Sequence, residues 1–142
     1  MLIRPAHPND VQIIYQFICE LENILFDFPL FKELFLQNIT QPNYCYLVVE
    51  YQKEVIGYLS CHAQVLLHHC GLVGEIQELF IHPAHRNKKI GQQLLLEVER
   101  FAQENGWVSL EVTCNKVRLD THRFYKKAGF TNTHLKFTKE LR

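Results

Sequence analysis

Apolar residues recur along the chain at two spacings, and these spacings predict alternating strands and helices. Apolar runs predict strands over residues 2–5, 44–50, 55–67, 72–82 and 107–114, with a polar turn at 52–54 joining the second and third strands into a hairpin. Helical spacing predicts helices over 7–23, 29–40, 90–106 and 118–129, with Gly106 as a C-terminal cap. Residues 130–141 are expected to end the chain in extended form. The predicted order is β-α-α-β-β-β-α-β-α-β, an α/β (α+β) arrangement.

Composition narrows the class of protein. The 142 residues are 47% hydrophobic, which suits one domain over 1–142 with a real core. Fifteen basic and fifteen acidic side chains cancel, so no overall field favours nucleic acid or an anionic membrane surface. No segment approaches the ~18 apolar residues of a membrane span, and we expect a soluble, cytoplasmic protein. Five cysteines without a CxxC pair indicate buried thiols, not disulfides or a zinc ribbon.

A basic loop precedes the third helix. Arg86, Lys88 and Lys89 lie where a strand ends and a helix begins, although the first turn of a helix already carries partial positive charge. A bound phosphate or pyrophosphate would make these cations favourable. The loop is neither a Walker A loop nor a GxGxxG fingerprint, because its only glycine is Gly91. The alternative is a solvated basic loop without a ligand.

The sequence "RNKKIG" at 86–91 resembles the acyl-CoA loop of the GCN5-related N-acetyltransferases, Arg or Gln-x-x-Gly-x-Gly or Ala. "ELFIHP" before it is similar to the family's fourth strand, and "RFYKKAGF" at 123–130 is similar to its aromatic-Tyr-x-x-x-Gly-Phe ending. The resemblance implies the acyl-CoA N-acyltransferase fold, a mixed central sheet with flanking helices, and acetyl-CoA as co-substrate. Lys89 departs from the pattern because the family has its first glycine there, which limits how closely the loop can approach phosphate.

The resemblance also implies the residues that bind the cofactor. Backbone groups of the fourth strand pair with the pantetheine arm, and the loop amides and cations hold the diphosphate. Asn115 would hydrogen-bond the cofactor, and its alternative role is to cap the helix that follows. The expected cofactor-binding residues are Leu79, Phe80, Ile81, Arg86, Asn87, Lys88, Lys89, Ile90, Gly91 and Asn115.

Acetyl transfer to an amine needs a base for the ammonium proton and an acid for the departing thiolate. Glu78 is our candidate base, and its alternative is a surface residue of an edge strand. Glu75 is the rival, and the two point to opposite faces unless a β-bulge intervenes. Tyr125 matches the tyrosine that protonates the CoA thiolate in this family. Its alternative is a core aromatic beside Phe124 and Phe130.

Longer segments carry a narrower resemblance. "ICEL", "LLHHCGLVGEIQEL", "THRFY" and "FTKEL" are similar to the aminoalkylphosphonate N-acetyltransferases, a group associated with divalent metal use. His62, His68 and His69 cluster near a strand end and offer ligands for a phosphonate or for a metal that binds it. Partly buried histidines with hydrogen-bonded rings are the alternative for all three. We assign His68 and His69 to the substrate and no residue to a metal.

The favoured function is therefore acetyl-CoA-dependent N-acetylation of a small primary amine, preferably an aminoalkylphosphonate. A polyamine, an aminoglycoside or a protein N-terminus are the alternative acceptors, and the sequence leaves a homodimer open. The other class of function is a non-catalytic acyl-CoA sensor. A sensor needs the basic loop but neither Glu78 nor Tyr125, so their presence together favours the enzyme.

Overall fold

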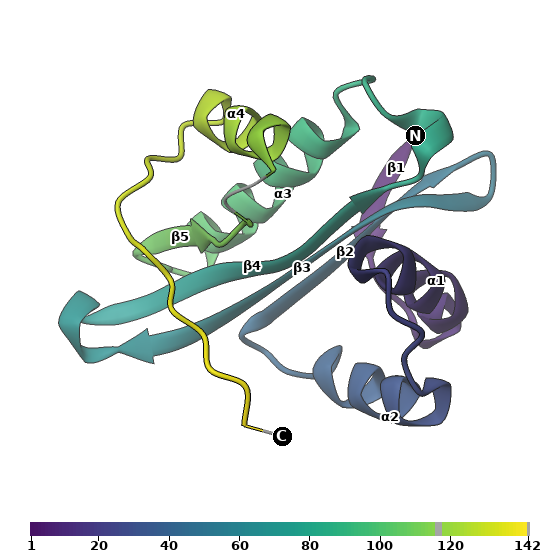
Figure 1. Cartoon of the computed structure of the whole chain (residues 1–142), viewed down its shortest axis with the longest axis horizontal. Coiled ribbons are helices and arrows are strands. Elements are labelled where there is room, and N and C mark those ends of the chain that lie inside the picture. The colour runs from purple at the N-terminus through teal and green to yellow at the C-terminus, as the bar shows by residue number, and fades with distance from the viewer. Residues whose placement is uncertain (116–117, 142) are drawn as a thin grey trace.

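A computed structural model describes residues 1–115 and 118–141, which form a twisted five-stranded sheet flanked by four α-helices (Figure 1). The strands are β1 (Leu2–Pro5), β2 (Tyr44–Tyr51), β3 (Glu54–Leu66), β4 (Gly71–Ile81) and β5 (Ser109–Val112). The helices are α1 (Val11–Glu22), α2 (Phe28–Asn38), α3 (Ile90–Glu104) and α4 (Leu119–Lys127). This confirms the expected mixed sheet with flanking helices.

The sheet follows the order of the chain, β1-β2-β3-β4-β5. The first four strands are antiparallel neighbours, and β5 runs parallel to β4 after the crossover through α3. The predicted hairpin is present, because Gln52 and Lys53 turn between β2 and β3 with positive φ angles of 50° and 67°. The β4–α3–β5 unit is the part of the fold that builds the site described below.

Each face of the sheet buries its own hydrophobic core, because the strands alternate and the helices are amphipathic. On one face, α1 and α2 pack over β2, β3 and β4, with Ile14 and Val48 fully buried. On the other face, α3 packs with Leu94 and Val98 fully buried. A Cβ at Gly74 would lie 2.4 Å from the ring of Trp107, so only glycine lets this ring cover β4.

A β-bulge interrupts the pairing of β3 with β4. Ser60 lies opposite Glu78, and the next residue, Cys61, lies opposite Ile76, so Gln77 is an extra residue in β4. In a regular strand, residues two positions apart point to the same face of the sheet. Across the bulge, residues three positions apart do so, because the extra residue adds one position. Glu75 and Glu78 therefore lie on the same face of the sheet, the face covered by α1 and α2.

Two expectations from the sequence are corrected. Residues 130–141 form neither helix nor strand, so the last strand of the predicted order is wrong. Phe130 packs against the core, but Leu135, Phe137 and Leu141 are 84%, 88% and 91% exposed, so the apolar side chains further along the segment are not held in a sheet. Cys45 and Cys61 are buried as expected, whereas Cys70 is exposed.

None of the helices in the described residues has the length and apolar character needed to cross a membrane.

Candidate active site

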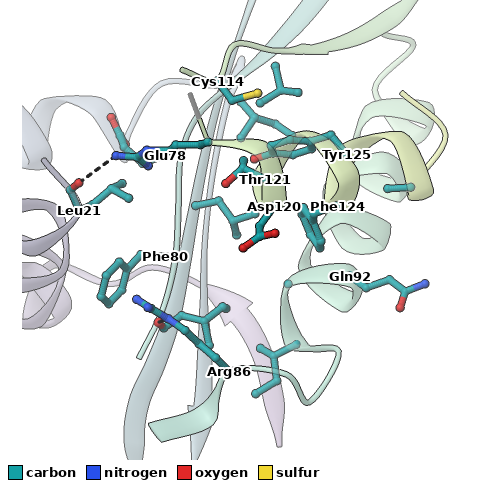
Figure 2. Close-up of a pocket in the computed structure, with 18 of the residues that line it drawn as sticks. Leu21, Glu78, Phe80, Arg86, Gln92, Cys114, Asp120, Thr121, Phe124 and Tyr125 are labelled. Carbon is teal, nitrogen blue, oxygen red and sulfur yellow. Dashed lines mark hydrogen bonds between the residues drawn. The ribbon is translucent and has the colours of Figure 1, made fainter. Parts of the chain in front are cut away.

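A cleft opens where β4 and β5 separate. The two strands pair only from Val73 opposite Ser109 to Ile76 opposite Val112. Beyond that point Gln77–Ile81 forms one wall of a cleft of about 860 Å³, and residues 112–115 with α4 form the other. The start of α3 closes one end and the last turn of α1 the other (Figure 2). This volume lies in the range of small-molecule sites.

Glu78 points into the interior next to this cleft. Its carboxylate accepts hydrogen bonds from the Ser60 hydroxyl and, at 3.2 Å, from the Tyr58 hydroxyl. Burial raises the pKa of Glu78, and the two hydrogen bonds oppose that rise by stabilising the charged form. A raised pKa suits a carboxylate that must both accept and release a proton near neutral pH. Ser60 and Tyr58 did not stand out in the sequence, because their link to Glu78 depends on the bulge.

Glu75 shares the face of Glu78 but has different surroundings. It lies opposite His62 in the neighbouring strand and does not line the cleft. The His62 ring shares a hydrogen bond of 2.7 Å with the Tyr46 hydroxyl, and it stacks on Tyr44 at 3.7 Å between centroids. Burial lowers the pKa of His62, and the charge of Glu75 opposes this. His62 is therefore a half-buried, hydrogen-bonded histidine of the sheet, and Glu78 is the carboxylate of the cleft.

Tyr125 lines the opposite wall of the cleft from α4. Its ring is 7% exposed and packs edge-on against Phe124 and Phe130, at 5.1 and 5.6 Å between centroids. Figure 2 shows its hydroxyl directed into the cleft. Burial, with a smaller effect from Cys114, raises the pKa of Tyr125 to about 12, so the phenol keeps its proton at neutral pH. The core packing and the proposed acid role are therefore compatible.

The loop before α3 reaches its turn without the expected glycine. Asn87 and Lys89 both adopt the left-handed conformation, each with a φ of 63°, and Lys89 is the N-cap of α3. For a lysine this conformation costs roughly 1 kcal/mol. Gly91 has a separate reason to be glycine, because a Cβ there would lie 3.2 Å from the Phe124 ring. No side chain of the described residues caps α3, and Lys89, Ile90 and Gly91 at its start line the cleft.

The basic residues of this loop differ in where they lie. Arg86 lines the cleft, but its Nε donates a hydrogen bond of 2.8 Å to the Ile81 carbonyl. Its guanidinium lies 5.2 Å from the centroid of the Phe80 ring, and Figure 2 shows the two side chains next to each other. Lys89 also lines the cleft, whereas Lys88 is exposed and does not. Two cations therefore lie at the expected anion site: Arg86, which contacts β4, and Lys89, at the start of α3.

The remaining predicted cofactor residues also gather here. Besides Arg86 and Lys89, the predicted cofactor residues that line the cleft are Leu79, Phe80, Ile81, Asn87, Ile90, Gly91 and Asn115. The Asn115 carbonyl accepts a hydrogen bond from the Arg118 backbone N–H at 3.0 Å, at the start of α4. The cleft residues that no sequence motif indicated include Leu21 and Glu22 at the end of α1 and Arg118 before α4. Only the fold brings these distant segments together.

His68 and His69 stand apart from the cleft. They form a short 3₁₀ turn, Leu67–His69, at the tip of the β3–β4 hairpin, which extends well beyond the helices (Figure 1). Leu66 lies six positions after Ser60 in β3, a distance of about 20 Å along a strand. His69 instead lies 3.9 Å from Glu111 of β5. The structure does not bring the two predicted substrate residues to the cleft.

The divalent metal suggested by the resemblance would need a cluster of ligand side chains. Within residues 1–115 and 118–141, no group of three or more His, Cys, Asp or Glu side chains could hold a metal ion.

Three comparisons with known proteins agree with this architecture. The model of the acetyltransferase (GNAT) family matches residues 12–130. The chain is 40% identical over 139 residues to the aminoalkylphosphonate N-acetyltransferase of Salmonella typhimurium (strain LT2), which covers 98% of this chain and 90% of that protein. Among solved structures, a transcriptional regulator from Bacillus halodurans C-125 superposes with a TM-score of 0.91 at 22% identity, covering 99% of both chains. Glucosamine-6-phosphate N-acetyltransferase from Arabidopsis thaliana does so with 0.84 at 17% identity, covering 99% of this chain and 98% of that one.

Proposed function

Because the chain belongs to the GNAT family and is an N-acetyltransferase of that type, we propose that it transfers the acetyl group of acetyl-CoA to the primary amine of an aminoalkylphosphonate. The observation that carries the mechanism is one cleft that holds a half-buried carboxylate, a protonated phenol and the uncapped start of a helix. The relative from Salmonella typhimurium supports the choice of acceptor.

Acetyl-CoA occupies the cleft between the separated strands in this proposal. The free edge of Gln77–Ile81 offers backbone groups to the pantetheine arm, since β5 no longer pairs with them. The amides at the start of α3, with Lys89 and Arg86 beside them, offset the charge of the diphosphate. The thioester then lies between Glu78 and Tyr125, which line opposite walls.

The proton transfers follow from the two shifted pKa values. Glu78 takes the ammonium proton, directly or through water, and the neutral amine attacks the thioester carbonyl. The tetrahedral intermediate collapses, the C–S bond breaks, and the thiolate takes the proton of Tyr125 as CoA leaves. The second amine proton is lost as the amide forms and restores Tyr125 through solvent. Glu78 returns its proton to water, so one proton is released for each ammonium acetylated.

A thiol-release assay with acetyl-CoA and a panel of amines tests the proposal. The panel contains 2-aminoethylphosphonate, 1-aminoethylphosphonate, glucosamine 6-phosphate, spermidine and a peptide with a free N-terminus, with mass spectrometry of each product. We expect the aminophosphonates to give the highest kcat/KM. Faster acetylation of spermidine or the peptide than of both aminophosphonates would refute the choice of acceptor. No thiol release above background with any amine would favour the non-catalytic sensor.

A further inference from the structure

The cleft has a cation at the end away from the basic loop. Arg118 precedes α4, lines the cleft and is exposed. Its guanidinium reaches across to the last turn of α1, where it donates a hydrogen bond of 3.4 Å to the Leu21 carbonyl, marked by the dashed line in Figure 2. Arg118 therefore bridges two segments 97 positions apart in the sequence, at the end of the cleft opposite the start of α3.

Carboxylates lie close to this bridge. Glu22 follows Leu21 in α1, lines the cleft, and its negative charge is one of the influences that raise the pKa of Glu78. Both carboxylates line the same cleft, Glu78 from β4 and Glu22 from the end of α1. The end of the cleft where the base lies thus carries negative charge from Glu78 and Glu22, with the positive charge of Arg118 beside it.

The contact that Arg118 makes is weak for an arginine. A distance of 3.4 Å exceeds the 2.7–3.2 Å of an ordinary N–H···O bond, and the acceptor is an uncharged carbonyl. A guanidinium has five donors in a planar fork that matches the oxygen atoms of a phosphonate, phosphate or carboxylate. An anionic group in this position would therefore replace a long neutral hydrogen bond with shorter, charge-assisted ones.

We infer that Arg118 binds the anionic group of the acceptor and so selects zwitterionic amines, whose ammonium faces Glu78 and Glu22 while the anion faces the guanidinium. This rests on the proposed function, since it assigns a residue to the acceptor of the same cleft. It transfers to Arg118 the role that the sequence suggested for His68 and His69. It also gives a reason to reject spermidine, because a second ammonium would meet the positive charge of Arg118.

The test compares acceptors with and without the anion. Arg118→Gln removes the charge and keeps polarity, Arg118→Lys keeps a point charge without the fork, and Arg123→Gln is the matched control. Arg123 is an exposed arginine of α4 that pairs with Asp120 and does not line this cleft. Steady-state kinetics with 2-aminoethylphosphonate and propylamine are measured for each variant, together with KM for acetyl-CoA and a thermal melt.

We expect Arg118→Gln to raise KM for 2-aminoethylphosphonate roughly 10- to 100-fold, the range for losing hydrogen bonds to a charged group. Arg118→Lys should recover part of the loss. KM for acetyl-CoA and kcat/KM for propylamine should stay within about twofold of wild type, since neither ligand presents an anion to Arg118. Arg123→Gln should match wild type throughout. Equal losses for both amines, or no loss for the phosphonate, would overturn the inference.

The acceptor panel separates this inference from the proposed function. If wild type acetylates glucosamine 6-phosphate and not the aminophosphonates, the proposed acceptor is wrong, and the Arg118 variants are then compared on glucosamine 6-phosphate and glucosamine. A loss confined to the phosphorylated sugar supports Arg118 as the anion site, and an equal loss refutes it. If wild type acetylates only amines without an anionic group, both proposals fail.

Discussion

Replacing Ser60 with alanine should move the acid limb of the pH profile of kcat/KM to higher pH. The Ser60 hydroxyl is fully buried and donates to the Glu78 carboxylate, so it stabilises the charged form of the base. A hydrogen bond to a charged group is worth about 1.5–3 kcal/mol. One pKa unit corresponds to about 1.4 kcal/mol, so the loss should raise the pKa of Glu78 by about 1–2 units.

The direction in which the acid limb shifts follows from the role of Glu78 as a base. Only the ionised carboxylate accepts the ammonium proton, so kcat/KM for the acceptor falls as the pH drops through the pKa of Glu78 in the enzyme–acetyl-CoA complex. A higher pKa therefore shifts the fall to higher pH and lowers the rate at neutral pH, while the rate on the alkaline side of the limb recovers. Tyr58→Phe should give a smaller shift in the same direction, because its bond to Glu78 is longer, at 3.2 Å.

The assay is thiol release with saturating acetyl-CoA across the pH range, using one acceptor for every variant so that its own ionisation is constant. Cys61→Ala is the control, because Cys61 follows Ser60, is equally buried and packs in the core on the opposite face. Its limb should coincide with that of wild type. An unmoved limb in a folded Ser60→Ala protein, or an equal shift in Cys61→Ala, would refute the role of Glu78 as the titrating base.

Four further variants test the cofactor site, the acid and the fold. Arg86→Ala should weaken CoA at least roughly tenfold in a calorimetric titration and leave the acceptor KM unchanged; unaltered CoA affinity would contradict the diphosphate site. Tyr125→Phe should lower kcat by ~10² to 10⁴ with CoA affinity kept, and wild-type turnover would remove the phenol from the mechanism. Glu78→Gln should raise the thermal midpoint at neutral pH. Burial raises the pKa of Glu78, so wild-type stability falls as pH rises through that pKa, and the difference in midpoint should shrink in acid; a difference that does not change with pH would contradict this. Gly74→Ala should lower the free energy of unfolding in urea by about 1–3 kcal/mol, because the new Cβ would overlap the Trp107 ring at 2.4 Å; an unchanged midpoint would contradict it.

Much of the fold could be predicted because its longest elements have regular apolar spacing. The helix expected over 90–106 is α3 (Ile90–Glu104), and the strand expected over 55–67 is β3 (Glu54–Leu66). The basic loop and Tyr125 were also recognisable, because their signal is a local motif. Residues 130–141 show the limit of this reasoning, since alternation predicts a strand only where a neighbouring strand and a core accept it.

The residues at the end of the cleft proposed for the acceptor amine could not be predicted from their spacing in the sequence. Arg118 and Glu22 come from segments far apart in the sequence, and neither belongs to a motif. His68 and His69 lie close in sequence to Glu75, but a long hairpin carries them away from the cleft. Strict alternation put Glu75 and Glu78 on opposite faces, and a single inserted residue reverses that result.

The bulge at Gln77 is a difference in length between two paired strands, and it could be removed without changing a pair. Deleting Gln77 would leave Glu78 opposite Ser60 and Ile76 opposite Cys61, so β4 would become regular and Glu75 and Glu78 would keep their common face. A library of single-codon deletions should therefore tolerate the loss of this residue better than the loss of a residue within 78–81, where one missing residue breaks the alternation of side chains around the candidate base.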